Sequence, residues 1–214
     1  MPQGSNLGPL LFLLYIKNLP NCLETANTSL FADEINLSCE GKSSPEFKQK
    51  LNADLDNVHN WLMANKLTFN KEKTEYTIVV SRQRLELLSI ANLDVTIGEQ
   101  KIKRVLMEKV LGVIIDDQLK WDKHNNVQCK TISRSISLLK RDRQFVPQET
   151  LLTMYNSFVL PHFSYCSTIW HDGNNTNMDK LYKLQKRAAR VITGSQYDER
   201  STETCNNLSW NTIN

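Results

Sequence analysis

The chain has 214 residues, of which 40% are hydrophobic and 23% are charged. This composition is typical of globular proteins and excludes a chain that is disordered throughout. The net charge of +3 is small but unevenly spread: residues 1–70 carry 5 Lys and Arg against 7 Asp and Glu, which leaves 21 against 16 for residues 71–214. The basic half is C-terminal, so a case for nucleic-acid binding has to rest on that half.

The cysteines and the apolar runs exclude further classes of protein. The five cysteines are odd in number, widely spaced and contain no Cys-x-x-Cys, so neither a disulfide framework nor a zinc site is indicated. The longest apolar run, residues 9–16, is too short to span a bilayer and lacks the features of a signal peptide. We therefore expect an intracellular protein, nuclear or cytoplasmic, with no membrane partner.

The chain opens on a loop that leads into an apolar stretch. Pro2, Gly4 and Ser5 are loop formers, and the apolar residues after them predict a buried helix that ends near Pro20. A folded domain seldom begins in this way. We expect that earlier structure is absent, or that Met1 is an internal methionine.

Residues 30–38, Leu-Phe-Ala-Asp-Glu-Ile-Asn-Leu-Ser, place two adjacent acids between two short apolar runs. The pattern predicts a strand, a turn and a second strand, although a two-residue hairpin turn prefers Asn-Gly or Asp-Gly because its central residues need positive φ. Glu34 is a poor turn former. Two explanations stay open: the loop is longer than two residues and the acids are incidental, or a ligand such as a cation has placed carboxylates at the hairpin tip.

The next segments predict a long helix followed by strands. Ser44 as the N-cap and Pro45 at the first helical position begin a helix whose apolar stripe runs from Phe47 to Leu62. β-Branched residues and turn-like Gly98-Glu99 and Asp116-Asp117 then predict strands and hairpins. These strands are expected in residues 66–70, 71–81, 93–105 and 109–121.

The hydrophobic period changes to that of helices at about residue 120. One helix is predicted through Ile132, Ile136 and Leu139, and two more over residues 147–160 and 177–192. The polar tail after Gly194 is expected to be disordered. The fold class is therefore α+β, with a helical region after the strands.

Five ordered blocks of the sequence carry a family resemblance. The blocks are Pro2-Gln3-Gly4-Ser5 with Leu7-Gly8-Pro9-Leu10; Phe31-Ala32-Asp33; Asn65-Lys66-Leu67 with Asn70 and Lys73-Thr74; Leu111-Gly112-Val113 with Asp116, Leu119, Trp121 and His124; and Leu-Gln-Lys-Arg-Ala-Ala-Arg-Val-Ile-Thr-Gly at 184–194. In this order they resemble the later palm and the thumb of a reverse transcriptase from a non-LTR, LINE-like or jockey-like, retrotransposon. The resemblance extends over about residues 1–194. It implies a partial palm, a sheet with packed helices, at residues 1–118, a helical thumb or connection at 119–194, and a disordered tail at 195–214.

The resemblance also implies RNA-templated DNA synthesis with two Mg²⁺ ions, an RNA template, a DNA primer and deoxynucleotides. It implies that Asp33 and Glu34 are catalytic and metal-binding, and that Lys73 protonates the leaving pyrophosphate. The expected contacts to nucleotide and template are Pro2, Gln3, Gly4 and Ser5, and the expected primer grip is Leu111, Gly112 and Val113. Two cations that bridge the attacking and leaving oxygens need hard carboxylate ligands on rigid supports, and a hairpin tip is such a support.

The sequence departs from the family pattern at this acidic hairpin. The family normally has Asp-Asp there, whereas Glu34 is longer by one carbon bond, about 1.5 Å. The family's other metal-binding aspartate precedes the Pro-Gln-Gly loop on which this chain begins. We therefore expect a C-terminal fragment that binds Mg²⁺ weakly or not at all and is inactive alone. Two alternatives stay open, a non-catalytic nucleic-acid-binding remnant and a decayed reading frame without a selected role.

Two surfaces are expected to make contacts. The hairpin strands should leave an unpaired sheet edge through which copies self-associate. In residues 180–191 an apolar stripe of Leu181, Leu184, Ala188 and Val191 lies beside a row of basic residues. This row predicts contacts to a nucleic-acid backbone, with an ordinary solvated helix face as the alternative, and consists of Lys180, Lys183, Lys186, Arg187 and Arg190.

Overall fold

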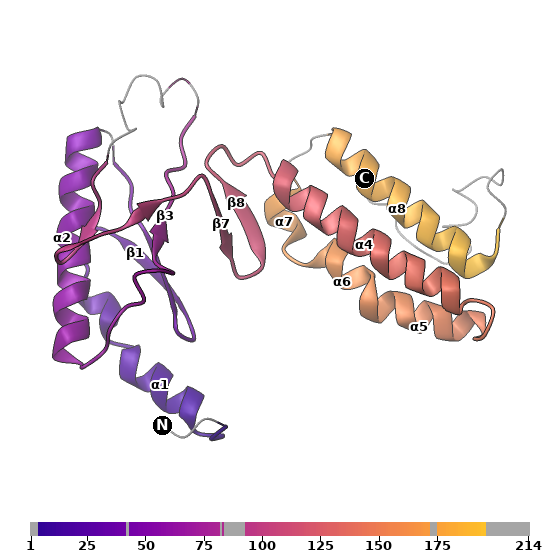
Figure 1. The fold of residues 1–214 in the computed structure, drawn as a ribbon, viewed down its shortest axis with the longest axis horizontal. Coiled ribbons are helices and arrows are strands. Elements are labelled where there is room, and N and C mark those ends of the chain that lie inside the picture. The colour runs from indigo at the N-terminus through magenta and orange to yellow at the C-terminus, as the bar shows by residue number, and fades with distance from the viewer. Residues whose placement is uncertain (1–3, 42, 82, 84–92, 172–174, 196–214) are drawn as a thin grey trace. The chain divides into compact units, whose positions relative to one another are not determined.

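The computed structural model describes residues 4–41, 43–81, 83, 93–171 and 175–195 (Figure 1). The chain forms two compact units, residues 1–108 and 109–214, each with its own hydrophobic core. The boundary between the two units lies between Glu108 and Lys109. The expected disordered tail lies outside the described residues from position 196 onward.

The first unit mixes helices with short strands. Its elements are α1 (Gly8–Ile16), the 3₁₀ turn η1 (Leu19–Cys22), β1 (Asn27–Phe31), β2 (Glu34–Ser38), α2 (Ser44–Ala64), β3 (Glu75–Tyr76), β4 (Thr96–Ile97), β5 (Gln100–Lys101) and β6 (Lys103–Arg104). The strands pair as β1 with β2 and β4 with β5, both antiparallel, and as β3 with β6, parallel. The predicted turn at Gly98-Glu99 is confirmed, because it joins β4 to β5.

The predicted long helix, α2, contributes side chains to both hydrophobic clusters of the first unit. It begins at Ser44, so the N-cap is Ser43 and not Ser44. Val58 and Leu62 pack on Leu19 of η1. A second cluster in the same unit contains Leu55, Ile78, Leu93, Val95, Ile97 and Ile102. The apolar stripe of α2 is therefore core packing.

Residues 66–70 do not form the predicted strand, because they end α2 and begin a turn. Lys66 has a positive φ of 53°, and the Leu67 N–H donates to the Leu62 carbonyl at 2.9 Å. With the Lys66 N–H on the Met63 carbonyl at 3.1 Å, this is the Schellman arrangement of a helix end. The backbone donors that a strand would need are used by the helix.

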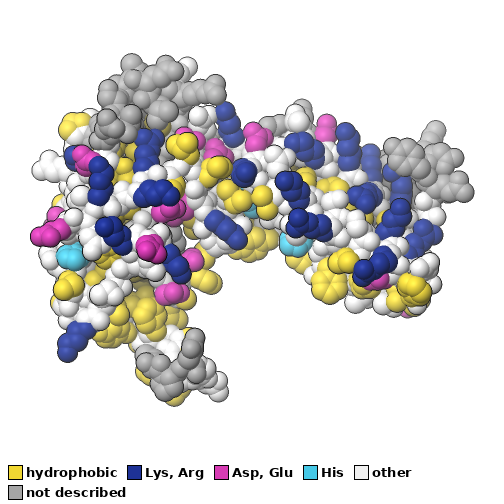
Figure 2. Space-filling view, viewed as in Figure 1, with side chains coloured by type: hydrophobic (Ala, Val, Ile, Leu, Met, Phe, Trp, Pro, Cys, Tyr) yellow, Lys and Arg dark blue, Asp and Glu magenta, His cyan; other side chains and the backbone are white. Residues whose placement is uncertain are grey.

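The prediction that the first helix is buried is wrong. α1 ends at Ile16, which is its buried residue, while Leu7 just before it is 62% exposed and Leu10 is 55% exposed. Because α1 is apolar on every side, its sequence does not indicate which face a partner covers. The surface of the first unit accordingly carries an apolar patch along α1 (Figure 2).

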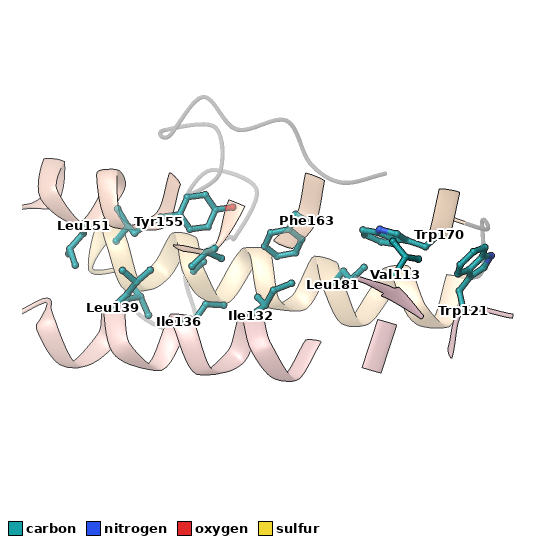
Figure 3. Close-up of a cluster of buried hydrophobic side chains, with 14 residues drawn as sticks. Val113, Trp121, Ile132, Ile136, Leu139, Leu151, Tyr155, Phe163, Trp170 and Leu181 are labelled. Atoms are coloured by element: carbon teal, nitrogen blue, oxygen red, sulfur yellow. The ribbon is translucent and has the colours of Figure 1, made fainter. Parts of the chain in front are cut away.

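The second unit is a helical bundle with one hairpin. β7 (Met107–Val110) crosses the unit boundary and pairs with β8 (Val113–Asp116). The helices are α4 (Asp122–Asp142), α5 (Gln148–Phe158), α6 (Leu160–Ser164), α7 (Ser167–Trp170) and α8 (Asn175–Thr193). Their core includes Ile132, Ile136, Leu139, Leu151, Tyr155, Phe163, Trp170 and Leu181 (Figure 3). No helix of the described residues is long and apolar enough to cross a membrane.

The helix predicted over residues 147–160 is interrupted. α5 ends at Phe158 and α6 begins at Leu160, and Val159 between them has a φ of −115°, far from the value of a regular helix. Pro161 explains the break, because a proline cannot donate the backbone hydrogen bond that would continue the helix. The predicted helices through Ile132 and over 177–192 are confirmed as α4 and α8.

Candidate functional site

The acidic hairpin has a two-residue turn, but its central residues are Ala32 and Asp33. Glu34 is the first residue of β2 and pairs with Phe31. The explanation that the loop is longer than two residues is therefore wrong. Ala32 has a positive φ of 52°, a conformation that costs a non-glycine residue about 1 kcal/mol. Both acids are exposed.

The described residues do not complete a magnesium site at this turn. Asp33 and Glu34 are two neighbouring carboxylates, and within the described ranges no group of three or more His, Cys, Asp or Glu side chains could hold a metal ion. Mg²⁺ demands near-octahedral oxygen coordination and takes its protein ligands from carboxylates held in fixed positions. The donor set on these residues therefore does not fit the ion by itself.

A buried carboxylate that the sequence analysis missed holds the start of this hairpin. Asp54 of α2 is 1% exposed and accepts hydrogen bonds from the Glu24 N–H at 2.7 Å, the Ala26 N–H at 2.7 Å and the Thr25 hydroxyl at 2.6 Å. Burial alone would raise the pKa of Asp54, but these hydrogen bonds outweigh it and lower the pKa. The signal was present, because an acid stands three residues after Leu51 within the apolar stripe.

The other candidates of the first unit lie in separate loops. Pro2 and Gln3 are outside the described residues. Gly4 is exposed with a φ of 92°, and the Ser5 carbonyl accepts from the Gly8 N–H at 3.2 Å as the loop enters α1. Lys73 is exposed in a turn after α2, and its N–H donates to the Asn70 side chain at 3.3 Å.

The hairpin of the second unit presents its turn to solvent. Leu111 and Gly112 are the two turn residues between β7 and β8, with φ values of 46° and 88°, as a type I′ turn requires. Leu111 is 40% exposed, whereas Val113 is 5% exposed and packs in the bundle core. The three candidate primer-grip residues are therefore together, but only the first two are accessible.

The loop between β8 and α4 is held together by hydrogen bonds to one side chain. The Asp116 carboxylate accepts from the backbone N–H groups of Gln118, Lys120 and Trp121 at 3.0 to 3.1 Å. Asp116 therefore ends β8 and organises the loop into α4, so the predicted Asp116-Asp117 turn is found as this loop. The type of residue at position 116 was the signal for this turn, since Asp side chains accept hydrogen bonds from nearby backbone N–H groups.

The basic residues of α8 lie where its helical spacing predicts. Leu181 and Ala188 are fully buried, Val191 is 8% exposed and Leu184 packs partly against the core. On the other side, Lys180, Lys183 and Arg187 are exposed, while Lys186 and Arg190 are partly buried. The Lys186 ammonium stands 3.8 Å above the Tyr182 ring, which fixes its position through a cation–π contact.

α4 runs parallel to α8 and lies beside its basic residues. The sequence pattern of α8 alone did not predict this neighbour. Asn177 donates to Asp122 at 2.8 Å, Lys180 to Asn126 at 3.3 Å, and Arg187 to Ser133 at 3.1 Å and to Ser137 at 3.4 Å. The residue numbers of the paired side chains differ by a nearly constant amount along the two helices, so α4 and α8 run in the same direction. They lie side by side in Figure 1.

α4 adds its own exposed cations next to this contact row. A helix places residues that are seven and four apart on one face. Lys123, Lys130, Arg134 and Arg141 follow that spacing beside Asn126, Ser133 and Ser137. Together the two helices carry ten Lys and Arg residues against three Asp. Figure 2 shows Lys and Arg side chains gathered over α4 and α8, and we call this surface the α4/α8 basic face.

Comparison with known proteins decides the family. The family described as reverse transcriptase (RNA-dependent DNA polymerase) matches residues 1–121, which is more than half of the chain. The chain belongs to the reverse transcriptase family. The expected resemblance to non-LTR retrotransposon reverse transcriptases is thereby confirmed, because the curated relatives of this reverse transcriptase chain are polymerases of such elements.

These relatives come from fruit flies. The chain is 22% identical to the probable RNA-directed DNA polymerase from transposon X-element of Drosophila melanogaster and 25% identical to that from transposon BS of the same species, over 100% of this chain and 24% of each relative. It is 24% identical to the RNA-directed DNA polymerase from mobile element jockey of Drosophila funebris, over 95% of this chain and 23% of the relative. The chain thus spans about a quarter of the length of these relatives. No solved structure matches it.

The candidate residues of this reverse transcriptase chain lie at separate places in the described structure. Asp33 is in the β1–β2 turn and Glu34 begins β2, and Lys73 is on a turn of its own after α2. The Leu111–Gly112 turn and the α4/α8 basic face belong to the second unit. Residues 109–214 carry 14 Lys and Arg against 10 Asp and Glu, and residues 1–108 carry 12 against 13, so the net positive charge lies in the second unit, as the uneven charge of the sequence predicts.

Proposed function

We propose that this chain is the part of a retrotransposon reverse transcriptase that holds the primer–template duplex, and that the α4/α8 basic face contacts its phosphates. The reaction served is RNA-templated DNA synthesis, with an RNA template, a DNA primer and deoxynucleotides as partners. Residues 1–118 correspond in this proposal to part of the palm, and residues 119–194 to the thumb or connection. The observation that carries the proposal is the parallel pair of helices with ten cations and three acids.

The dimensions and chemistry of the face suit a nucleic-acid backbone. A helix of 21 residues such as α4 is about 30 Å long, close to one helical turn of a duplex. Lys and Arg release counterions from phosphates when they bind, which gives affinity without reading sequence. Asn126, Ser133 and Ser137 add neutral side chains along the same row, and such groups also donate to phosphate oxygens.

The remaining assignments follow the family motifs. We propose that Pro2, Gln3, Gly4 and Ser5 lie against nucleotide and template, and that the exposed Leu111–Gly112 turn lies against the primer end. Asp33, with Glu34, is the hairpin carboxylate that the family uses for metal ions, and Lys73 is the family's acid. The family generally uses divalent metal ions.

The test of the proposal is the salt dependence of duplex binding. Fluorescence anisotropy on an RNA/DNA hybrid across a salt series should give a slope of log affinity against log salt between about −3.5 and −4.5 if five cations contact phosphates. Lys130→Gln combined with Lys183→Gln removes one exposed cation from each helix of the face. The slope should then become shallower by about 1.4 to 1.8, at roughly 0.7 to 0.9 per contact.

The matched control removes the same charge elsewhere. Lys17→Gln combined with Lys48→Gln changes two lysines of the first unit, and the slope should stay within error of the parent chain. Equal losses in both double variants would show that net charge, not the α4/α8 basic face, drives binding. An unchanged slope in Lys130→Gln with Lys183→Gln would show that the face is only solvated.

A further inference from the structure

The exposed turn of the β7–β8 hairpin is tied to the bundle by two hydrogen bonds from side chains outside the hairpin. The Tyr165 hydroxyl, between α6 and α7, donates to the Leu111 carbonyl at 2.6 Å. Beyond the turn, the Ile114 N–H donates to Nδ1 of His124, in the first turn of α4, at 3.2 Å. The turn is therefore held on both sides by side chains that the known motifs give no role.

These two side chains are connected to each other through Trp170. The Trp170 indole N–H donates to the Tyr165 carbonyl at 2.8 Å, and the Trp170 ring lies 5.6 Å from the His124 ring at 50°. A continuous series of contacts therefore runs from Leu111 through Tyr165, Trp170 and His124 to Ile114. Trp170 is 2% exposed and packs in the bundle core (Figure 3). His124 is 1% exposed, so both rings of this contact are buried.

The hairpin needs such support, because an isolated pair of four-residue strands is at best marginally stable in water. Val113 packs into the core, but its packing does not fix the direction of the exposed turn before it. A bond at the Leu111 carbonyl fixes the turn itself, since that carbonyl belongs to one of its two central residues. The added Cβ of an alanine at Gly112 would stand 3.7 Å from the Tyr165 ring, so the ring lies directly beside the turn.

We propose that Tyr165 and His124 are positioning residues that hold the Leu111–Gly112 turn in the orientation in which it meets the primer end. The contact with the primer rests on the proposed function, whereas the holding of the turn does not. Neither residue touches the reacting atoms in this proposal. They act through the turn that they fix.

The role of His124 depends on its neutral form. Nδ1 accepts the Ile114 N–H, so the proton of the neutral ring is on Nε2. Burial lowers the pKa of His124, which keeps the ring neutral near pH 7. Charged or titratable side chains on the segments around it include Asp116, Asp122, Lys123, Tyr165 and Cys166, and none of them contributes to this lowered pKa, whose cause is burial. A protonated Nδ1 would face the Ile114 N–H as a second donor and break the bond.

The experiment measures amide hydrogen exchange of residues 107–116 by NMR in the full chain. Tyr165→Phe keeps the ring and removes the hydroxyl, and exchange in the hairpin should become about two- to tenfold faster. His124→Leu should accelerate exchange at Ile114 by a similar factor, while His124→Asn, which keeps an acceptor without a titrating ring, should stay within about twofold of the parent. The control Tyr182→Phe removes a hydroxyl from α8 and should leave the hairpin unchanged.

Acidification supplies a readout that a merely structural role does not move. After correction for intrinsic exchange, the parent chain should lose protection at Ile114 as pH falls through the lowered pKa of His124, and His124→Asn should not. Unchanged hairpin exchange in Tyr165→Phe and His124→Leu would overturn the positioning role. Faster exchange with unchanged affinity for a primed RNA template would overturn the contact with the primer. An unchanged salt slope in Lys130→Gln with Lys183→Gln would instead count against the proposed function, which separates the two failures.

Discussion

The buried carboxylate of Asp54 shows how one residue can join two elements. It lies on α2, yet its hydrogen bonds reach the backbone of residues 24–26, immediately before β1. Those N–H groups lie before the strand and need an acceptor. A carboxylate with several donors is worth more here than the apolar side chain that the α2 stripe would otherwise have, because hydrogen bonds to a charged group are the strong ones.

We expect Asp54→Asn to lower the free energy of unfolding of the first unit by about 1–3 kcal/mol at pH 7, because one charged acceptor with several donors is lost. The pKa of Asp54 in the folded chain is below the ordinary value of 3.8. Its stabilisation is therefore complete well above pH 3.8 and is lost as pH falls through the lower folded pKa, because the unfolded chain takes up the proton first. Urea unfolding of both proteins should show their difference shrinking in that acid range.

Asp56→Asn is the matched control, since Asp56 is exposed on the same helix. It should change the free energy of unfolding by no more than about 0.5 kcal/mol. A cost for Asp54→Asn that is equally small, or that does not vary with pH, would contradict the assignment of Asp54 as a charged anchor.

At the scale of elements, α1 and the β1–β2 hairpin are the parts of the first unit that bury little of their apolar surface. Leu11, Leu13, Leu14 and Tyr15 of α1 are 46% to 53% exposed, and Phe31 at the hairpin tip is 59% exposed. β1 and β2 form a two-stranded sheet, so each has one unpaired edge among the described strands. Large apolar patches and open strand edges are the surfaces through which proteins associate.

We expect the purified chain to self-associate through α1, and Leu11→Glu with Leu14→Glu to weaken this association. Glutamate is a good helix former, so the change should remove apolar surface without ending the helix. Sedimentation velocity over a range of concentrations should show a concentration-dependent increase in mass for the parent chain and a smaller one for the variant.

Val127→Glu with Leu138→Glu places two acids at exposed apolar positions of α4, which are 41% and 51% exposed. This control should associate as the parent does. A parent chain that sediments as a concentration-independent monomer would contradict the expected association, and an equal effect of both double variants would show that added charge, rather than α1, is responsible.

At the scale of the whole molecule, the two units carry different groups of the candidate residues. The first unit holds the hairpin acids and Lys73, and the second holds the turn beside Tyr165 and the α4/α8 basic face. Nucleic-acid binding is therefore expected from one unit, while polymerisation needs the carboxylates of the other. Two-metal catalysis depends on ligands that hold both ions in fixed positions.

We expect the chain by itself to bind a primed RNA template without extending the primer. Asp33 and Glu34 are the two carboxylates at the β1–β2 turn, and the described residues bring no third ligand to them. The assay supplies Mg²⁺, deoxynucleotides and a labelled primer, and an active reverse transcriptase serves as the positive control. Binding without extension would fit the proposal, in which this chain is a part of the polymerase.

Template-dependent extension that disappears in Asp33→Ala would contradict this expectation and would show that the chain assembles a working site. Extension that survives Asp33→Ala would point to a contaminating polymerase. Because the same preparations are used for the salt series, binding and synthesis can be compared directly.

The sequence alone determined the family and most of the helices. The ordered blocks from Pro2 to Gly194 were enough to name the family, and the helical spacing in α2, α4 and α8 was enough to find them, because both signals are local. The tip of the acidic hairpin was predicted only roughly. Whether Ala32 or Glu34 sits in the turn depends on strand register, which the pattern of apolar residues does not resolve when both strands are short.

Only the tertiary structure decided what each face meets. The sequence of α1 is apolar enough for a core helix, yet burial needs a partner surface, and the described part of the first unit covers little more than Ile16. The roles of Asp54, Tyr165 and His124 were not predicted for the same reason. The partner of Asp54 is 28 residues away along the chain and that of Tyr165 is 54 residues away, while that of His124 is on a neighbouring strand. Hydrophobic periodicity shows that a helix has an apolar and a polar face, but only the packing of distant segments shows what lies beside each face. α4 is an example, because it packs beside α8 and adds its own cations to the basic row of α8.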